Sequence, residues 1–310
     1  MTGRLAGKVA IITGASRGLG EYCAVGYARE GAKVVIAART ETETDPRLPG
    51  TIHHTAELVK AAGGEALPVV CNVGDMGSVE AMVAKVLDHW GQVDILMTNA
   101  AVQPQGQIST IKPKSWELEF NINVHGPFRC IRAVLPAMQA AKSGNIINIS
   151  SVAAFGGSHY GATKRAIEAM TIGLARELKD DGITVNAMRP VGGIETPGLL
   201  FGRPASRPAG AAGPAPGAAR PGLPKPDSYV EAAILLALQT PDSFTGQVFN
   251  DAQLIEKLSD EATKRKYRET NPENWVKAMT VCYTSPGGRG RGPRPKASGK
   301  VRGYGLSALS

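Results

Sequence analysis

Tyr160 and Lys164 are two side chains whose types and spacing could do chemistry. Residues four apart on a helix lie on one face, one turn from each other. A nearby ammonium stabilises a phenolate, so we expect Lys164 to lower the pKa of Tyr160 from its reference value of about 10. A tyrosine tuned in this way can donate a proton to a carbonyl oxygen or accept one from an alcohol. The spacing alone is a weak signal, because chance Tyr–Lys pairs on helix surfaces are common.

A glycine-rich turn near the N-terminus could bind a dinucleotide. Residues 9–12 form an apolar run typical of a strand buried on both faces of a parallel sheet, and the turn at residues 13–20 follows directly. Gly14 permits a tight turn, Gly18 lets a pyrophosphate approach the backbone, and Gly20 lets the next helix pack against the sheet. The N-terminus of that helix then faces the phosphates. An ordinary glycine-rich loop is the alternative, but the flanking strand and helix favour dinucleotide binding.

The end of the second expected strand favours NADP(H) over NAD(H). An acidic residue at this position binds the ribose 2′-hydroxyl of NAD and repels the 2′-phosphate of NADP. This sequence has Ala38 there, followed by Arg39, and Arg17 lies within the glycine turn. Two guanidinium groups without a carboxylate favour a 2′-phosphate. The alternative is that Arg39 is a solvated residue at a strand end.

Strands and helices alternate along the chain. We expect strands at residues 9–12, 33–38, 66–70, 93–98, 144–151, 183–188 and 244–250. We expect helices at residues 19–30, 51–62, 76–90, 116–140, 160–179 and 229–239, the fourth of them bent at Pro127 and broken late at Pro136. The alternation predicts an α/β fold, a Rossmann-type doubly wound parallel sheet with helices on both faces.

Two segments depart from this alternation. Residues 202–226 are dominated by Gly, Pro and Ala, so we expect a mobile loop that could close over a substrate. Residues 285–310 form a tail rich in Arg, Gly and Pro, which we expect to be disordered. We therefore expect one domain over residues 1–284, followed by the basic tail.

Charge and cysteine usage exclude several classes of protein. Six of the eight net positive charges lie in residues 285–310, so the rest is nearly balanced and does not favour a nucleic-acid partner. The alternative is a protein that binds an anionic polymer through this tail. We find neither a signal peptide nor a membrane span. The four cysteines lack metal-binding spacing and the histidines lack an H-E-x-x-H pattern, which favours reduced thiols, no metal site and a cytoplasmic location: Cys23, Cys71, Cys130 and Cys282.

Taken together, the motifs resemble those of the short-chain dehydrogenase/reductase family. They follow the family's order over about residues 5 to 250, and include the glycine turn, Asn99-Ala100-Ala101, Asn123, Ser151, Tyr160 with Lys164, and Pro190 through Thr196. Residues 37–40 and 46–52 are similar to those of the hydroxysteroid-dehydrogenase-like branch. The resemblance implies a dinucleotide-dependent enzyme that interconverts a carbonyl and an alcohol on a small-molecule substrate. It also implies a homodimer or homotetramer formed through the two long expected helices, at residues 116–140 and 160–179.

The resemblance also implies roles for individual residues. Ser151 would bind the substrate oxygen, Tyr160 would act as general acid/base, and Lys164 would hold the nicotinamide ribose. Asn123 would order a water relay to that lysine. Ile194 and Thr196 would contact the nicotinamide carboxamide. The full expected cofactor site is Thr13, Gly14, Ser16, Arg17, Gly18, Leu19, Gly20, Arg39, Asn72, Val73, Asn99, Ala100, Ala101, Tyr160, Lys164, Pro190, Ile194 and Thr196.

Three features depart from the family pattern. Ser151 and Tyr160 are only nine residues apart, Asn72 stands where an aspartate is usual, and residues 190–193 carry an extra residue. The short interval leaves Ser150 or Ser158 as alternatives to Ser151. It also leaves open a second function, a dinucleotide-binding regulatory protein with weak catalysis.

Overall fold

A single parallel sheet forms the centre of the molecule. The computed structural model describes residues 3–43, 45, 48–194, 196, 225–270 and 275. Within them, seven strands pair in the order β3-β2-β1-β4-β5-β6-β7, and every pairing is parallel. The strands are β1 Val9–Thr13, β2 Lys33–Ala38, β3 Glu65–Val70, β4 Ile95–Thr98, β5 Gly144–Ile149, β6 Ile183–Arg189 and β7 Val248–Asn250. The predicted doubly wound α/β fold is confirmed.

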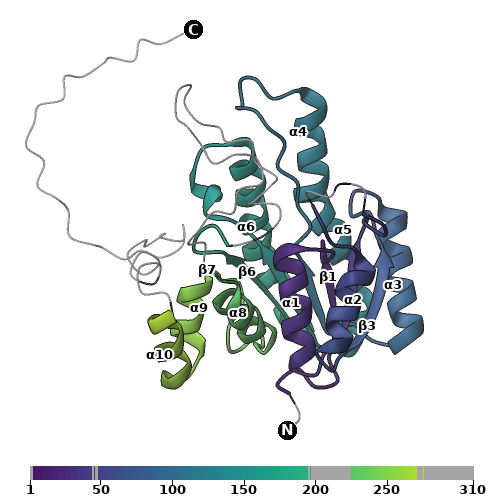
Figure 1. Ribbon diagram of the computed structural model, residues 1–310, viewed down its shortest axis with the longest axis vertical. Coiled ribbons are helices and arrows are strands. Elements are labelled where there is room, and N and C mark those ends of the chain that lie inside the picture. Colours follow the sequence, from purple (N-terminus) through teal and green to yellow (C-terminus); the bar gives the residue numbers. More distant parts are fainter. Residues whose placement is uncertain are drawn as a thin grey trace, which may run out of the picture.

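Helices cover both faces of the sheet (Figure 1). On one face lie α1 Gly18–Arg29, α2 Ile52–Ala61, α8 Asp227–Ala237 and α9 Asp251–Leu258. On the other lie α3 Met76–Trp90, α5 Gly126–Ala141 and α6 His159–Glu177. Alternate strand residues feed the two cores, because successive side chains point to opposite faces: Ala10 and Ile12 join the first core, Val9 and Ile11 the second.

The expected long helix at residues 116–140 is wrong in detail. The chain instead forms α4 Pro113–Phe120, a π-helical turn Asn121–His125 and then α5. Pro127 explains the irregularity, because proline has no N–H to donate to the carbonyl of Asn123 four residues earlier. A π-helical turn is typical of such a disturbance and of functional sites.

The C-terminal part also differs from expectation. The last strand begins at Val248, not at residue 244, and lies at the edge of the sheet. Helices α9 and α10 Glu261–Thr270 were not predicted. Most of the expected loop at 202–226 and all of the expected tail at 285–310 lie outside the described residues. No helix of the described chain is long and apolar enough to cross a membrane.

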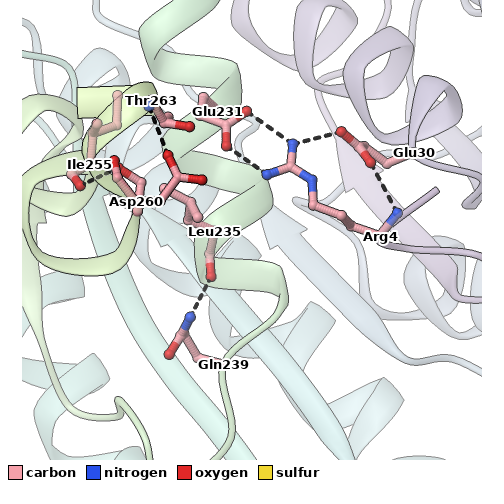
Figure 2. A network of polar contacts seen from close by, with 9 residues as sticks. Arg4, Glu30, Glu231, Leu235, Gln239, Ile255, Asp260 and Thr263 are labelled. Carbon is pink, nitrogen blue, oxygen red and sulfur yellow. Dashed lines mark hydrogen bonds and ion pairs between the residues drawn. The ribbon is translucent and has the colours of Figure 1, made fainter. Parts of the chain in front are cut away.

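An ion-pair cluster ties the N-terminal segment to two helices. The guanidinium of Arg4 lies between the carboxylates of Glu30, just after α1, and Glu231 on α8, at 2.6 Å from each (Figure 2). The cluster joins residues more than 200 positions apart in sequence. None of its three residues lines the cleft at the ends of β1 and β4.

Candidate active site

A cleft of about 450 Å³ opens where the strand order reverses, between β1 and β4. Ligands of doubly wound sheets bind at this switch point, outside the carboxyl ends of the strands. The cleft is lined by the glycine turn, the ends of β2, β3 and β4, and the start of α6: Gly14, Ser16, Arg17, Gly18, Leu19, Ala38, Arg39, Thr40, Leu48, Cys71, Asn72, Val73, Asn99, Ala100, Ala101, Val102, Ile122, Tyr160 and Thr196.

The glycine turn requires its glycines. Gly14 has φ +65°, and a Cβ there would lie 2.7 Å from the Cα of Ala100. A Cβ on Gly20 would lie 2.6 Å from the carbonyl oxygen of Gly14. Helix α1 begins at Gly18, and Arg17 before it provides no side-chain cap. The side chain of Arg17 therefore does not bond the first N–H groups of α1. A pyrophosphate bound at this helix end would need these N–H groups as donors.

Asn99 and Thr13 fix the turn to the end of β4. The Asn99 side-chain amide donates to the carbonyl oxygens of Thr13 and Gly14, at 2.9 and 3.1 Å. The Thr13 hydroxyl oxygen accepts from the backbone N–H groups of Asn99 and Ala100, at 3.0 and 3.1 Å. Asn99 thus lines the cleft and also holds its floor in place.

The two arginines expected to favour a 2′-phosphate have different surroundings. Arg17 donates to the carbonyl oxygens of Pro49 and Gly50, at 3.2 and 2.8 Å, and so anchors the segment before α2. Gly50 has φ +108°, a conformation that favours glycine. Arg39 is exposed at the end of β2 and lines the cleft. Unlike Arg17, Arg39 does not bond to Pro49 or Gly50.

Tyr160 and Lys164 lie together on the first turns of α6. Tyr160 lines the cleft, and the Nζ atom of buried Lys164 lies 5.4 Å from the centre of its ring. The ammonium also donates to the carbonyl oxygen of Ile149 at 2.8 Å. Burial lowers the pKa of Lys164 from 10.5 to about 8, and the nearby charge of Glu119 opposes this shift.

Asn123 lies buried in the π-helical turn and connects two elements beside the cleft. Its side chain accepts from the N–H of Val102 and donates to the carbonyl oxygen of Val102, both at 2.8 Å. It also donates to the Thr163 hydroxyl at 3.2 Å. Asn123 therefore joins the segment after β4 to the helix that carries Tyr160.

Ser151 is not among the residues that line the cleft. Its hydroxyl oxygen accepts from the N–H of Ala153 at 3.2 Å and caps the short 3₁₀ turn Val152–Phe155. Both alternatives have structural bonds: Ser150 is buried and donates to Glu168 at 2.7 Å, and Ser158 accepts from the N–H of Gly161 at 3.0 Å as the N-cap of α6. Ser151 is half-buried, and its bond to Ala153 leaves its O–H able to donate.

The short segment from Ser151 to Tyr160 is braced by a buried ion pair. Arg189, at the end of β6, donates to Glu168 on α6 at 2.6 Å. The same guanidinium lies 4.4 Å from the ring centre of Phe155, a cation–π contact. The charge pair therefore holds the 3₁₀ turn against the sheet.

The other expected cofactor residues fall into two groups. Ser16, Leu19, Asn72, Val73, Ala100, Ala101 and Thr196 line the cleft, whereas Thr13, Gly20, Lys164, Pro190 and Ile194 do not. Ile194 is buried in the core. Six lining residues were not in the expected cofactor site, although all except Leu48 lie at a predicted strand end or beside a predicted site residue: Ala38, Thr40, Leu48, Cys71, Val102 and Ile122. No cluster of three metal-ligating side chains occurs among the described residues.

Comparisons with known proteins agree with this geometry. The family model for short chain dehydrogenases matches residues 8–199. Hydroxysteroid dehydrogenase-like protein 2 of Xenopus laevis is 33% identical over 263 residues, which cover 82% of this chain and 59% of that protein. A 3-oxoacyl-(acyl-carrier-protein) reductase of Synechocystis is 36% identical over 191 residues, covering 60% of this chain and 74% of that protein. A metagenomic short-chain oxidoreductase solved in complex with NADP is 30% identical, with TM-score 0.63, covering 79% of this chain and 96% of that one.

Proposed function

The chain belongs to the short-chain dehydrogenase family, as its motifs predicted, and we propose that it is an NADP(H)-dependent oxidoreductase that interconverts a carbonyl and a secondary alcohol. One observation carries this proposal. The cleft joins the glycine turn, Arg39 and Tyr160 in one continuous surface, so a dinucleotide on the turn would reach the tyrosine. The chain spans 59% of the length of the Xenopus laevis relative, so the activity of the whole protein is also a proposal.

Each residue of the proposed centre has a task in proton transfer and positioning. The bound nicotinamide supplies or accepts the hydride. In reduction, the Tyr160 hydroxyl gives its proton to the substrate oxygen, and in oxidation the phenolate takes it back. The Lys164 ammonium stabilises the phenolate and would hold the ribose. Ser151 would donate its O–H to the same substrate oxygen, and Asn123 would order the water relay to Lys164.

Arg39 supports NADP(H) as the cofactor. Its exposed guanidinium lies at the end of β2, where Ala38 supplies no carboxylate to repel a 2′-phosphate. A charge-assisted contact of this kind is among the stronger hydrogen bonds in proteins. We also propose a cytoplasmic location, since the cysteines of the described chain are buried, free thiols: Cys23, Cys71 and Cys130.

A second function stays open because of Ser151. Its hydroxyl caps a 3₁₀ turn and is not part of the cleft lining, so the chain could bind a dinucleotide as a regulatory protein with weak catalysis. The two functions share the cofactor site and differ in turnover.

Tyr160→Phe separates these two functions. We expect measurable reduction of carbonyl substrates with NADPH by the native chain, and a loss of about 100-fold or more in kcat in the variant, with NADPH affinity retained. The measurement is NADPH oxidation followed by absorbance, beside a binding titration followed by fluorescence. Dinucleotide binding without turnover that depends on Tyr160 would favour the regulatory function.

A further inference from the structure

A buried acid–histidine pair lies directly beside Tyr160. Glu119 is the only buried residue of α4, and it is fully inaccessible to solvent. Its Oε2 atom lies 2.6 Å from Nδ1 of His159, the first residue of α6. The other ring nitrogen, Nε2, lies 3.0 Å from the carbonyl oxygen of Gly106. The pair therefore joins α4, the segment after β4 and the helix that carries Tyr160.

The partners of His159 determine how many protons the pair holds. A carbonyl oxygen only accepts, so Nε2 must carry a hydrogen that it donates to Gly106. Nδ1 and the carboxylate oxygen can both accept, so a second proton must lie between them at this distance. The pair is then either an imidazolium with a carboxylate or a neutral imidazole with a carboxylic acid. Both forms have no net charge, which suits a site without access to water.

His159 is also the main anchor of the start of α6. Among residues 151–160, it alone is buried, and the preceding 3₁₀ turn contains no buried residue. Beside the contact of Phe155 with Arg189 and the N-cap of Ser158, the buried side chain of His159 therefore fixes Tyr160 on its N-terminal side. A tyrosine that transfers a proton needs a fixed position relative to its substrate.

We propose that Glu119 and His159 are positioning residues for Tyr160, which hold the start of α6 against α4 and Gly106 through their shared proton. This inference rests on the proposed function, because it assigns the residues that orient its acid/base. Lys164, one turn after Tyr160 on α6, is close enough for its charge to act on Glu119. Burial raises the pKa of Glu119, and hydrogen bonding and charge from His159, then the charge of Lys164, oppose this rise.

Three substitutions test the pair. His159→Phe and Glu119→Leu remove the shared proton and its hydrogen bond. Glu119→Gln keeps a hydrogen bond, since the amide can donate to Nδ1 of a neutral His159 while Nε2 still donates to Gly106. Glu231→Leu is the control, because it breaks a contact between distant segments away from the cleft (Figure 2). Thermal melting of all four variants reports whether they fold.

The expected result is a split between catalysis and binding. His159→Phe and Glu119→Leu should lower kcat by about 100-fold while the Kd for NADPH changes by less than about threefold. Glu119→Gln should restore kcat to within about threefold of the native value, and Glu231→Leu should not lower it beyond that even if it melts at a lower temperature. A native kcat in His159→Phe, or a Glu119→Gln variant as slow as Glu119→Leu, would overturn the proposal.

A second readout does not depend on turnover. In protein labelled with ¹³C at the tyrosine ζ carbon, the Tyr160 signal can be assigned by its absence in Tyr160→Phe. We expect it to shift or broaden in His159→Phe and Glu119→Leu, and to keep its native position in Glu119→Gln and Glu231→Leu. An unmoved signal in the first two variants would refute positioning by the pair. A moved signal in a native chain that shows no turnover would support the pair while removing the oxidoreductase function.

Discussion

Arg39 offers the sharpest test of cofactor choice at the scale of single residues. Its guanidinium is exposed in the cleft, whereas Arg17 already donates to Pro49 and Gly50. We expect Arg39→Asp to weaken NADPH binding by about 10- to 100-fold, because it removes a charge-assisted contact and adds repulsion toward the 2′-phosphate. Fluorescence titration with NADPH and NADH measures this change. NADH affinity should stay level or rise, and an equal loss for both cofactors would show that Arg39 does not read the phosphate.

Burial of the Lys164 ammonium lowers the free energy of unfolding by an amount that can be measured. Its pKa is lowered from 10.5 to about 8, so the unfolded chain binds more protons than the folded chain between these values, and stability rises with pH across that range. Lys164→Met removes the buried charge, a relief on the order of 3 kcal/mol at pH 7 before the lost bond to Ile149 is counted. Relative to the native chain, the variant should therefore be most stable near neutral pH.

Urea denaturation of both chains at several pH values provides the measurement. The difference in unfolding free energy should shrink as the pH rises from 8 toward 10.5 and level off above 10.5, where the native lysine is neutral in both states. A difference independent of pH would mean that the folded chain does not lower the pKa of Lys164. Lys164→Met should also lose turnover, because the ammonium of Lys164 is part of the proposed active centre.

Residues joined by a short motif could be predicted, and residues joined across the fold could not. The glycine turn, Asn99 and Tyr160 follow from spacing along the chain, and the structure brings them to one cleft. The contacts between Arg17 and Gly50, and between Glu119 and His159, depend on pairs 33 and 40 positions apart. Nothing in the local sequence marks His159 as buried, so its contact with Glu119 was not foreseen.

Among the elements, the contact between α6 and β6 carries a buried ion pair. Glu168→Leu would leave the guanidinium of Arg189 buried without its carboxylate and would also remove the acceptor of Ser150. We expect a loss of about 3–5 kcal/mol in unfolding free energy, measured by urea denaturation. The double variant Glu168→Leu with Arg189→Met should recover part of this loss, because it also removes the buried guanidinium. A double variant less stable than Glu168→Leu alone would contradict this account.

The boundaries of α4 and α5 show why element prediction was incomplete. Hydrophobic spacing over residues 116–140 fits one helix, and the two prolines indicate only that something disturbs it. The disturbance appears before Pro127, at the carbonyl of Asn123, since a proline removes the hydrogen bond four residues toward the N-terminus. The resulting π-helical turn places Asn123 against Val102 and Thr163, contacts that require the folded sheet.

For the whole molecule, the alternation of apolar strands and helices was sufficient to predict the sheet and its two helical layers. Each strand from β1 to β6 lies within about two residues of its expected position. No helix or strand was expected beyond residue 250, where α9 packs on α8 and α10 packs on α9. Apolar periodicity determines a buried sheet more strongly than it determines peripheral helices.

The outer surface of α4 and α5 carries the last prediction, which concerns assembly. Phe128 on α5 is 53% exposed and Leu118 on α4 is 46% exposed, and both belong to the expected long-helix interface. A homodimer or homotetramer would bury these side chains, and large exposed apolar side chains are typical of such surfaces. We expect Phe128→Arg to lower the molar mass measured by size-exclusion chromatography with light scattering, because a buried unpaired charge disfavours association. Leu58→Arg, at an exposed apolar side chain of α2 on the other face of the sheet, is the matched control and should leave the mass unchanged. A native chain that runs as a monomer would refute this interface.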